Sequence, residues 1–342
     1  MKKLNYMHTV FFLFISMICW SCGGSDNTDI DGGKTDPDPE PPVTYVYTNL
    51  FSDSEYKKGF NVSSTQEGNA EVHGILDYGD ITTSAPVWRI AQWNCINNDI
   101  FAGTYSLNGS VHTYKTAKGN VVAADVEKGS LVLGINTSSE YGQNGITSNP
   151  RKSGESWPHL LIEYVLADKD ILKVDGKEEI RMDIAYNVTQ LDDKMPAGTT
   201  NADLHTAQFQ WYVTVQNRTQ GSEDYGRYIW FGLNFFDKRY EFPPAYAAQD
   251  GGKEHNTGAF IYVPEMSQIM GSQGKTAIGK DMHVDVDVLP IIKSAFKLAQ
   301  ERKYLLNTTW EDLYITTSNI GWEVPGTYDV TVRIDSVNIK YR

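Results

Sequence analysis

Carboxylates in apolar or aromatic surroundings are the residues of this chain best suited to chemistry. Glu163 lies in LLIEYV, Glu265 in YVPEM and Glu323 in GWEVPG, while Asp285 and Asp287 form a pair in HVDVDV. A carboxyl group between apolar neighbours acquires a raised pKa, as a general acid requires, and glycoside hydrolysis usually takes two carboxyl groups. If the chain is an enzyme, Glu163 and Glu323 are the catalytic candidates. Alternatively, Glu163 pairs with an arginine of a second sheet.

A histidine extends the aspartate pair. His283, Asp285 and Asp287 alternate with valines, so they share one face if the segment is a strand. Such an alternation can ligate a metal ion. A half-exposed strand with a polar side explains it more simply, and we predict no metal site.

Two segments, AQFQWYVTV (207–215) and YIWFGLNFF (228–236), carry one apolar face and one face of amides and aromatics. The second face includes Gln208, Gln210, Tyr212, Trp230 and Asn234. Sugars suit such a face, because their C–H groups stack on aromatic rings and their hydroxyls need donors and acceptors without fixed charge. We therefore predict that these five residues contact a glycan. Ordinary solvent-facing sheet, or sheet under a long loop, is the alternative.

A third aromatic segment is VWRIAQW (87–93). In a strand, Trp88 and Gln92 would lie on one side and Arg89 and Trp93 on the other. One tryptophan is then a core residue and the other a platform for a sugar. The sequence does not say which; Trp88 joins the predicted glycan contacts.

Two further features have competing interpretations. The segment 237–258 is long, rich in Gly and Pro, and contains Tyr, Arg and His, so it is either the rim of a binding surface or an insertion without function. Cys95, in AQWNCINN, is expected to be a small buried apolar residue and not a nucleophile.

Charge and missing motifs exclude several classes of function. The 342 residues include 30 basic and 43 acidic ones, a net charge of −13, which disfavours nucleic acid as a partner. There is no phosphate-binding glycine loop, Gly-x-Ser-x-Gly, His-Glu-x-x-His or paired cysteine beyond the leader. These absences argue against nucleotide enzymes, common serine esterases and zinc proteases.

Short alternating segments separated by Gly, Asn, Asp and Ser predict many strands from about Tyr45 onward. One helix is expected in LPIIKSAFKLAQERKYL, where apolar residues recur at helical spacing and Pro290 suits the first turn. Many strands and one helix near the C-terminus predict an all-β jelly roll of two sheets, similar in outline to concanavalin-like lectins and glucanases. That fold type allows a structural Ca²⁺, although no loop carries a calcium motif, and no other cofactor is expected.

The segment GWEVPGTYDVTVRIDSV resembles the late strand of concanavalin-like endoglucanases, in which Gly-x-Glu precedes the last strands and supplies a catalytic acid. Those enzymes also carry a glutamate on an earlier aliphatic strand. The local counterpart, PHLLIEY, has His159 at the aligned position and Glu163 four residues on. A Glu-x-Asp-x-x-Glu motif of the laminarinase type is absent.

The start of the chain predicts an export signal. Lys2 and Lys3 precede an apolar run from Val10 to Ile18, too short to span a membrane, and Cys22 follows. The stretch resembles the lipobox of bacterial lipoproteins, and the acids after Cys22 resemble the surface-export pattern of Bacteroidota lipoproteins. An ordinary secretory signal with an incidental cysteine is the alternative.

The predicted organisation has three parts: residues 1–21 are a signal peptide, 22–44 are the lipidated Cys22 with a disordered acidic and proline-rich tether, and 45–342 are the β-sandwich. A separate N-terminal subdomain up to about Gly119 stays open. The resemblance implies attachment to the outer membrane, exposed at the cell surface.

Three functions fit these observations. The first is a surface glycan-binding lipoprotein that captures polysaccharide or oligosaccharide, with an outer-membrane glycan transporter as a further partner. The second is an endo-acting glycoside hydrolase or polysaccharide lyase on the same scaffold. The third is a structural or adhesive surface lipoprotein without a glycan site.

Overall fold

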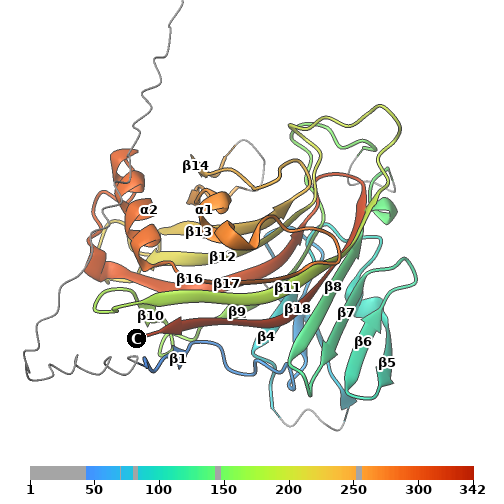
Figure 1. Cartoon of the computed structure of the whole chain (residues 1–342), viewed down its shortest axis with the longest axis horizontal. Coiled ribbons are helices and arrows are strands. Elements are labelled where there is room, and N and C mark those ends of the chain that lie inside the picture. The colour runs from blue at the N-terminus through green and yellow to red at the C-terminus, as the bar shows by residue number, and fades with distance from the viewer. Residues whose placement is uncertain (1–43, 70, 80–83, 143–147, 252–255) are drawn as a thin grey trace, which may run out of the picture. The chain divides into compact units, whose positions relative to one another are not determined.

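Segments in which apolar and polar residues alternate form two sheets, and these sheets pack face to face (Figure 1). The computed structural model describes residues 44–69, 71–79, 84–142, 148–251 and 256–342. The predicted signal peptide, Cys22 and the tether up to residue 43 lie outside them. The predicted all-β jelly roll is confirmed.

The larger sheet has ten strands. Along its edge-to-edge path they are β14 (Tyr246–Gln249), β15 (Phe260–Val263), β13 (Tyr228–Asp237), β12 (Gln208–Asn217), β17 (Leu313–Glu323), β9 (His159–Val165), β4 (Trp88–Ala91), β2 (Phe60–Ser63) and β3 (Val72–Leu76), and β10 (Leu172–Lys173) pairs with β17 off this path. Neighbours are antiparallel except for β13 with β15 and β2 with β4.

The smaller sheet has eight strands, all antiparallel to their neighbours. Its order is β16 (Asp281–Asp287), β11 (Ile180–Asp193), β18 (Tyr328–Tyr341), β8 (Ser130–Asn136), β7 (Val121–Asp125), β6 (Val111–Lys115) and β5 (Thr104–Asn108), and β1 (Thr48–Asn49) pairs with β18. Residues up to Gly119 supply strands to both sheets, and Val46–Arg342 form one unit. The described residues before Gly119 therefore do not form a separate subdomain.

The core contains the apolar faces that the alternation predicts. On β12 and β13 these faces are fully buried and comprise Phe209, Trp211, Val213, Val215, Ile229, Phe231, Leu233 and Phe235. The buried indoles also satisfy their N–H groups. Trp211 donates to Ser318 Oγ at 2.8 Å, and Trp322 donates to the Leu133 carbonyl of the other sheet at 3.1 Å.

The assignment of Trp88 to the glycan face was wrong. Its side chain is fully buried and packs against Phe51, Tyr56 and Tyr164. The indole donates to the Asp53 carbonyl at 3.0 Å. The expectation that one of the two tryptophans is a core residue is met by Trp88, whereas Trp93 is only partly buried.

The predicted helix is α2 (Leu289–Glu301), with Pro290 in its first turn and an apolar face against the core. A second, five-residue helix, α1 (Met266–Met270), was not expected. The described residues also form short 3₁₀ turns, which are η2 (Ile100–Ala102), η3 (Thr137–Ser139), η4 (Gly271–Gln273) and η5 (Trp310–Asp312).

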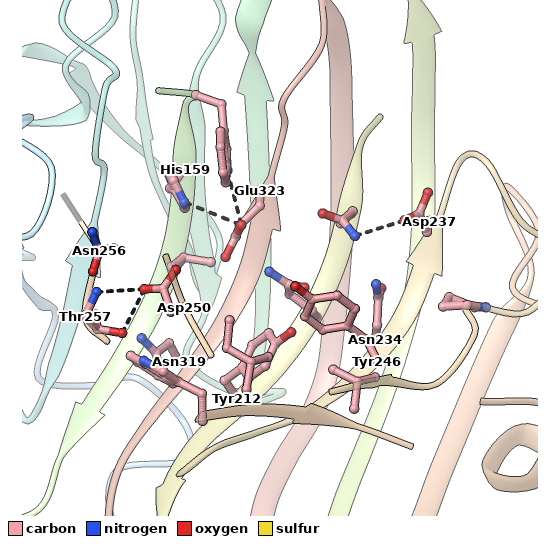
Figure 2. Close-up of a pocket in the computed structure, with 18 of the residues that line it drawn as sticks. His159, Tyr212, Asn234, Asp237, Tyr246, Asp250, Asn256, Thr257, Asn319 and Glu323 are labelled. Carbon is pink, nitrogen blue, oxygen red and sulfur yellow. Dashed lines mark hydrogen bonds and ion pairs between the residues drawn. The ribbon is translucent and has the colours of Figure 1, made fainter. Parts of the chain in front are cut away.

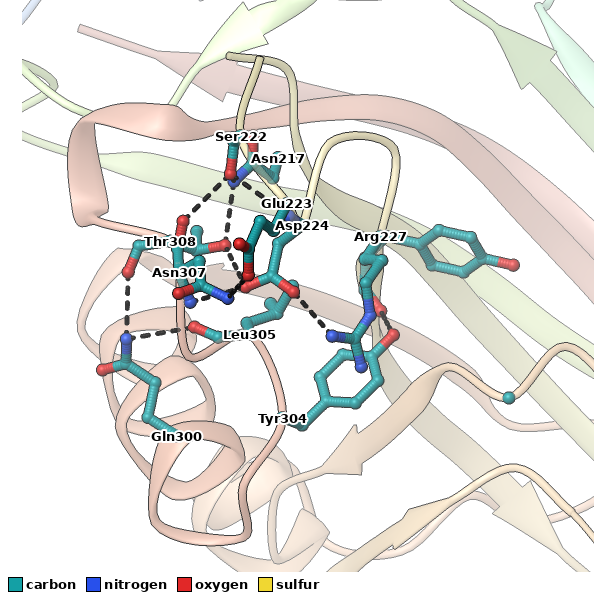
Figure 3. A network of polar contacts seen from close by, with 12 residues as sticks. Asn217, Ser222, Glu223, Asp224, Arg227, Gln300, Tyr304, Leu305, Asn307 and Thr308 are labelled. Atoms are coloured by element: carbon teal, nitrogen blue, oxygen red, sulfur yellow. Dashed lines mark hydrogen bonds and ion pairs between the residues drawn. The ribbon is translucent and has the colours of Figure 1, made fainter. Parts of the chain in front are cut away.

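A polar network centred on the buried Asp224 joins the β12–β13 hairpin to the segment after α2 (Figure 3). Asp224 accepts from Arg227 Nη1 at 2.6 Å and from the Asn307 amide at 2.7 Å. Arg227 lies over the ring of Tyr304, whose hydroxyl donates to the Tyr228 carbonyl at 3.0 Å. The network fixes the start of β13 against the C-terminal end of α2.

Gly321, near the end of β17, is a position where a side chain cannot fit. Its φ is +150°, and a Cβ there would lie 2.3 Å from the Leu160 carbonyl oxygen. We expect Gly321→Ala to lower the free energy of unfolding by about 1–3 kcal/mol, because both the backbone and β9 must shift. The urea unfolding midpoint measures the change.

Gly251 is the matched control, because its φ is not strained and a Cβ added there would have no heavy atom closer than 3.9 Å. Gly251→Ala should stay within about 0.5 kcal/mol of the parent. Equal losses in the two variants would contradict the strain at Gly321.

Candidate functional site

A groove of about 1030 Å³ lies over the face of the ten-stranded sheet that points away from the core. Strands β13, β12, β17 and β9 contribute its floor, and residues from the 237–258 segment and from 151–157 line its sides. The predicted glycan contacts Gln208, Gln210, Tyr212, Trp230 and Asn234 all line this one groove. The two-residue period therefore brought these five side chains together on one face.

Strand register arranges the floor in rows across the sheet. The first row is Asp237, Gln208, Glu323 and His159, one residue from each strand in the order β13, β12, β17, β9. The second row is Asn234, Gln210, Gly321 and Leu161, and the third is Gly232, Tyr212, Asn319 and Glu163. A ligand that lies across the strands meets one row at a time.

In the first row, Glu323 is held by two aromatic side chains (Figure 2). Trp157 donates from Nε1 to Glu323 Oε2 at 3.1 Å, and His159 Nε2 lies 3.6 Å from the same oxygen. The Trp157 ring stacks on His159, and the Arg151 guanidinium lies over Trp157 at 5.1 Å. Glu323 is thus a carboxylate of fixed orientation on the groove floor.

A β-bulge brings Asp237 into the same row. The register between β12 and β13 shifts after Phe209, so Phe235 and Phe236 together oppose it and Asp237 again faces the groove. Arg239 binds Asp237 through Nε at 2.9 Å and Nη2 at 2.6 Å, and this hydrogen bonding raises the pKa of Arg239. Thr206 Oγ1 also donates to Asp237, at 2.7 Å.

An aromatic cluster that starts at Tyr212 of the third row depends on a glycine. A Cβ at Gly232 would lie 2.2 Å from the Tyr212 ring, so only glycine lets that ring lie across β13. Trp230 meets Tyr212 edge-on at 6.0 Å and Tyr228 edge-on at 5.5 Å. Burial raises the pKa of the Tyr212 phenol, which therefore stays protonated near neutral pH.

Glu163, the second catalytic candidate, does not line the groove. It faces the same side of the sheet but is buried, and Arg89 Nε and Nη2 each lie 2.7 Å from its Oε2. Burial raises the pKa of Glu163. Glu163 pairs with Asn319, four residues along β17 from Glu323, a separation of about 13 Å at strand rise. Glycosidase carboxyl groups lie about 5–10 Å apart, so the structure does not bring this pair together.

The alternative that Glu163 pairs with an arginine is the one observed, but the arginine lies on the neighbouring strand and not in the other sheet. Asn319 Nδ2 also donates to Glu163, at 3.3 Å. These contacts hold the Glu163 carboxylate in place, as expected for a residue with a structural role.

The remaining acidic candidates lie outside the groove. Glu265 precedes α1 and accepts from the Ala245 amide at 3.3 Å. His283 and Asp285 are on β16 of the other sheet, paired with Asp183 and Arg181, each at 2.7 Å. Asp287 accepts from the Leu289 amide at 3.1 Å. Within the residues that the structure describes, no cluster of three His, Cys, Asp or Glu could hold a metal ion.

Sequence reasoning missed several residues of the groove. Trp157 and Asn319 line it, as do the exposed Tyr240 and Tyr246 of the 237–258 segment. Asn319 was detectable in principle, because it shares the face of Glu323 in the alternation of β17. Trp93, the second tryptophan of VWRIAQW, lines the groove in place of Trp88. The 237–258 segment is thus a rim of the groove where the structure describes it.

Cys95 is buried, and burial raises the pKa of its thiol. It matches the expected small core residue. Across the described parts of the chain, no helix combines the length and the apolar character that crossing a membrane requires.

No protein-family model and no curated protein matches the chain. The structure is similar to a thermostable cellulase derived from Cel12A of Rhodothermus marinus, with a TM-score of 0.36, 11% identity and coverage of 70% of this chain and 97% of that one. It is also similar to the family 12 xyloglucanase of Bacillus licheniformis (TM-score 0.36, 12%, coverage 70% and 97%). A family 11 xylanase of Neocallimastix patriciarum gives a TM-score of 0.32 at 8% identity, covering 74% and 100%. Strand order and layers, described above, establish the fold.

The contrast between Glu163 and Glu323 is testable. Glu163→Ala should lower the free energy of unfolding by about 3–5 kcal/mol, because it leaves Arg89 charged, largely buried and without its carboxylate. Glu323→Gln keeps an acceptor for Trp157 and should change stability by less than about 0.5 kcal/mol. Urea unfolding of both variants measures this. A stable Glu163→Ala protein would show that the pair has no structural role.

Proposed function

We propose that the groove binds a polysaccharide chain and that the protein captures glycans at the cell surface. The observation that supports this most strongly is the convergence of Trp230, Tyr212 and Gln210 with Glu323 and Asn319 on one face of four adjacent strands. These side chains offer ring faces for C–H groups and polar groups for hydroxyls within one groove. A groove lined by aromatic and polar groups is a typical ligand site.

The leader supports the cellular setting of this proposal. The lipobox-like start, with Cys22 as lipid anchor and an acidic tether behind it, fits a lipoprotein displayed on the outer membrane. Capture of polysaccharide there would supply an outer-membrane glycan transporter, which we propose as the partner. Such systems are typical of Bacteroidota.

Capture fits the carboxylates better than cleavage does. Hydrolysis needs two carboxyl groups that reach one glycosidic bond. Opposite Glu323, the neighbouring strand presents His159, and Asp237 two strands away accepts hydrogen bonds from Arg239, Thr206 and Gln208. On the four floor strands, Glu323 therefore has no second carboxylate of comparable exposure beside it; the other described carboxylates of the lining, Glu67, Glu155 and Asp250, come from the sides of the groove.

An endo-acting glycoside hydrolase is the second candidate, favoured by the fixed orientation of Glu323 on the groove floor. The solved structures to which the fold is similar are named as a cellulase, a xyloglucanase and a xylanase. That likeness concerns the fold, so this candidate rests on Glu323. A polysaccharide lyase is a weaker form of the candidate, since it needs a cation to bind a uronate.

Removal of the aromatic platform should abolish binding. In the double variant Trp230→Ala and Tyr212→Ala, two ring faces leave the groove floor, and we expect at least about a hundredfold loss of affinity, at about 1.5–3 kcal/mol for each ring that the ligand covers. Affinity electrophoresis through gels that each contain one polysaccharide measures the retardation.

Tyr105→Ala is the control, since Tyr105 is an exposed aromatic on β5 of the other sheet. It should migrate as the parent does. Unchanged retardation of the double variant, with a near-parental unfolding midpoint, would remove the groove floor from the site.

The same gels separate capture from cleavage. A binding protein is retarded and leaves the polymer intact, whereas a hydrolase clears the polymer around its band. We expect retardation without clearing. The Glu323→Gln variant should leave the polymer intact whether the parent protein binds the polymer or cleaves it. Clearing that disappears in Glu323→Gln would establish the hydrolase. Free migration in every gel would favour the structural or adhesive function.

A further inference from the structure

The polar side chains of the groove form two sets, and the first set already makes hydrogen bonds within the protein. Gln208 donates to Asp237 Oδ2 at 2.9 Å. Asn234, with its amide oriented to suit its neighbours, donates to the Phe236 carbonyl at 2.8 Å and accepts from Gln208 at 3.2 Å. Both were predicted as glycan contacts, but their hydrogen-bonding capacity is largely used within the first and second rows. Gln208 and Asn234 therefore hold neighbouring groups of the groove floor in position.

The second set consists of buried polar atoms without a partner. Asn319 Oδ1 and His159 Nδ1 are buried and have no hydrogen-bond partner. Both residues line the groove, on the adjacent strands β17 and β9. An unpaired buried acceptor is unfavourable, so a ligand group that donates to Asn319 Oδ1, once the amide shifts to expose that atom to the groove, would restore the missing hydrogen bond.

In the described lining of the groove, every arginine is already engaged with other groups of the protein. Its described lining contains five carboxylates, those of Glu67, Glu155, Asp237, Asp250 and Glu323. Two arginines are the only guanidinium or ammonium groups in that described lining.

Both arginines are occupied. Arg239 is bound to Asp237 and donates to the Ala202 carbonyl at 3.1 Å. Arg151 donates to the carbonyls of Pro325, Glu155 and Leu204 at 3.1, 2.7 and 2.7 Å. A uronate or sulfate ester in this groove would meet carboxylates without a guanidinium to pair with.

From these observations we infer that the groove selects non-anionic glycans, and that Asn319 reads a sugar hydroxyl that donates to its Oδ1. The inference rests on the proposed function and specifies its ligand class. Tyr212 lies directly opposite Asn319 in the third row, so the same sugar that donates to Asn319 would stack on or beside the Tyr212 ring. Asn319 is then the specificity residue that the sequence did not reveal.

Matched polymers test the ligand class with the full chain. Hydroxyethylcellulose and carboxymethylcellulose share one backbone and differ in charge, as do methyl-esterified and free polygalacturonate, and dextran and dextran sulfate. We expect retardation by the neutral member of at least one pair and at least tenfold weaker binding of its anionic partner at constant ionic strength. Equal or stronger binding of the anionic partner would overturn the inference while leaving polysaccharide binding intact. Retardation by no polymer would overturn the proposed function and the inference with it.

Variants test the role of Asn319 separately. Asn319→Ala removes the acceptor but leaves Glu163 paired with Arg89, so the fold should survive. We expect about tenfold or greater loss of affinity for the retained neutral polymer. Asn108→Ala, on exposed β5, is the control and should bind as the parent does.

A second variant keeps the inference falsifiable if Asn319→Ala is unstable. Asn319→Thr keeps a hydroxyl that can both donate to Glu163 and accept from a sugar, and it should retain more affinity than the alanine variant at equal unfolding midpoint. Parental affinity of a folded Asn319→Ala protein would show that Asn319 does not read the ligand.

Discussion

The two-residue period of β12, β13 and β17 is the constraint on which both the core and the groove depend. A single register separates Trp211 and Phe231, which fill the core, from Tyr212 and Trp230, which face the groove. A slip by one residue would exchange these sets and place amides in the core. The bulge at Phe235 and Phe236 breaks the strict alternation near the end of β13 and returns Asp237 to the groove side, and a second register shift lies between Thr214 and Val215 of β12. One pattern of alternating residues therefore determines both the fold and the site.

This dependence explains what the sequence could predict. Faces on long, strongly alternating strands followed from local pattern alone, so five of the six predicted glycan contacts line one groove. Trp88 was misplaced because the alternation separates it from Trp93 without saying which of the two faces the core, and the partners that enclose Trp88, Phe51 and Tyr164, are distant in the chain. Glu163 looked like a catalytic acid because its partner Arg89 lies 74 positions away. Trp157 reaches the site from a loop, and the two-residue alternation of strands gives no information about side chains in loops.

The structure shows which residue His159, at the aligned position, lies against. The resemblance to endoglucanase strands placed a histidine where a glutamate was expected, and the register sets that histidine directly opposite Glu323. Carboxylate, imidazole and indole therefore form one compact polar cluster on the floor. Such a cluster combines hydrogen-bond donors and acceptors within one row of the sheet.

Strand β18 has a consequence for how the molecule must be made. It follows every other strand in the chain, yet it lies between β11 and β8 inside the eight-stranded sheet and also pairs with β1. Until its residues are available, β11 and β8 remain two open edges with no template between them, and the sheet that backs the groove cannot close. Its contacts with Thr48 and Asn49 span nearly the whole domain. Closure of the eight-stranded sheet therefore has to wait for β18, and it carries the loop-closure entropy of contacts between segments that are distant in the sequence.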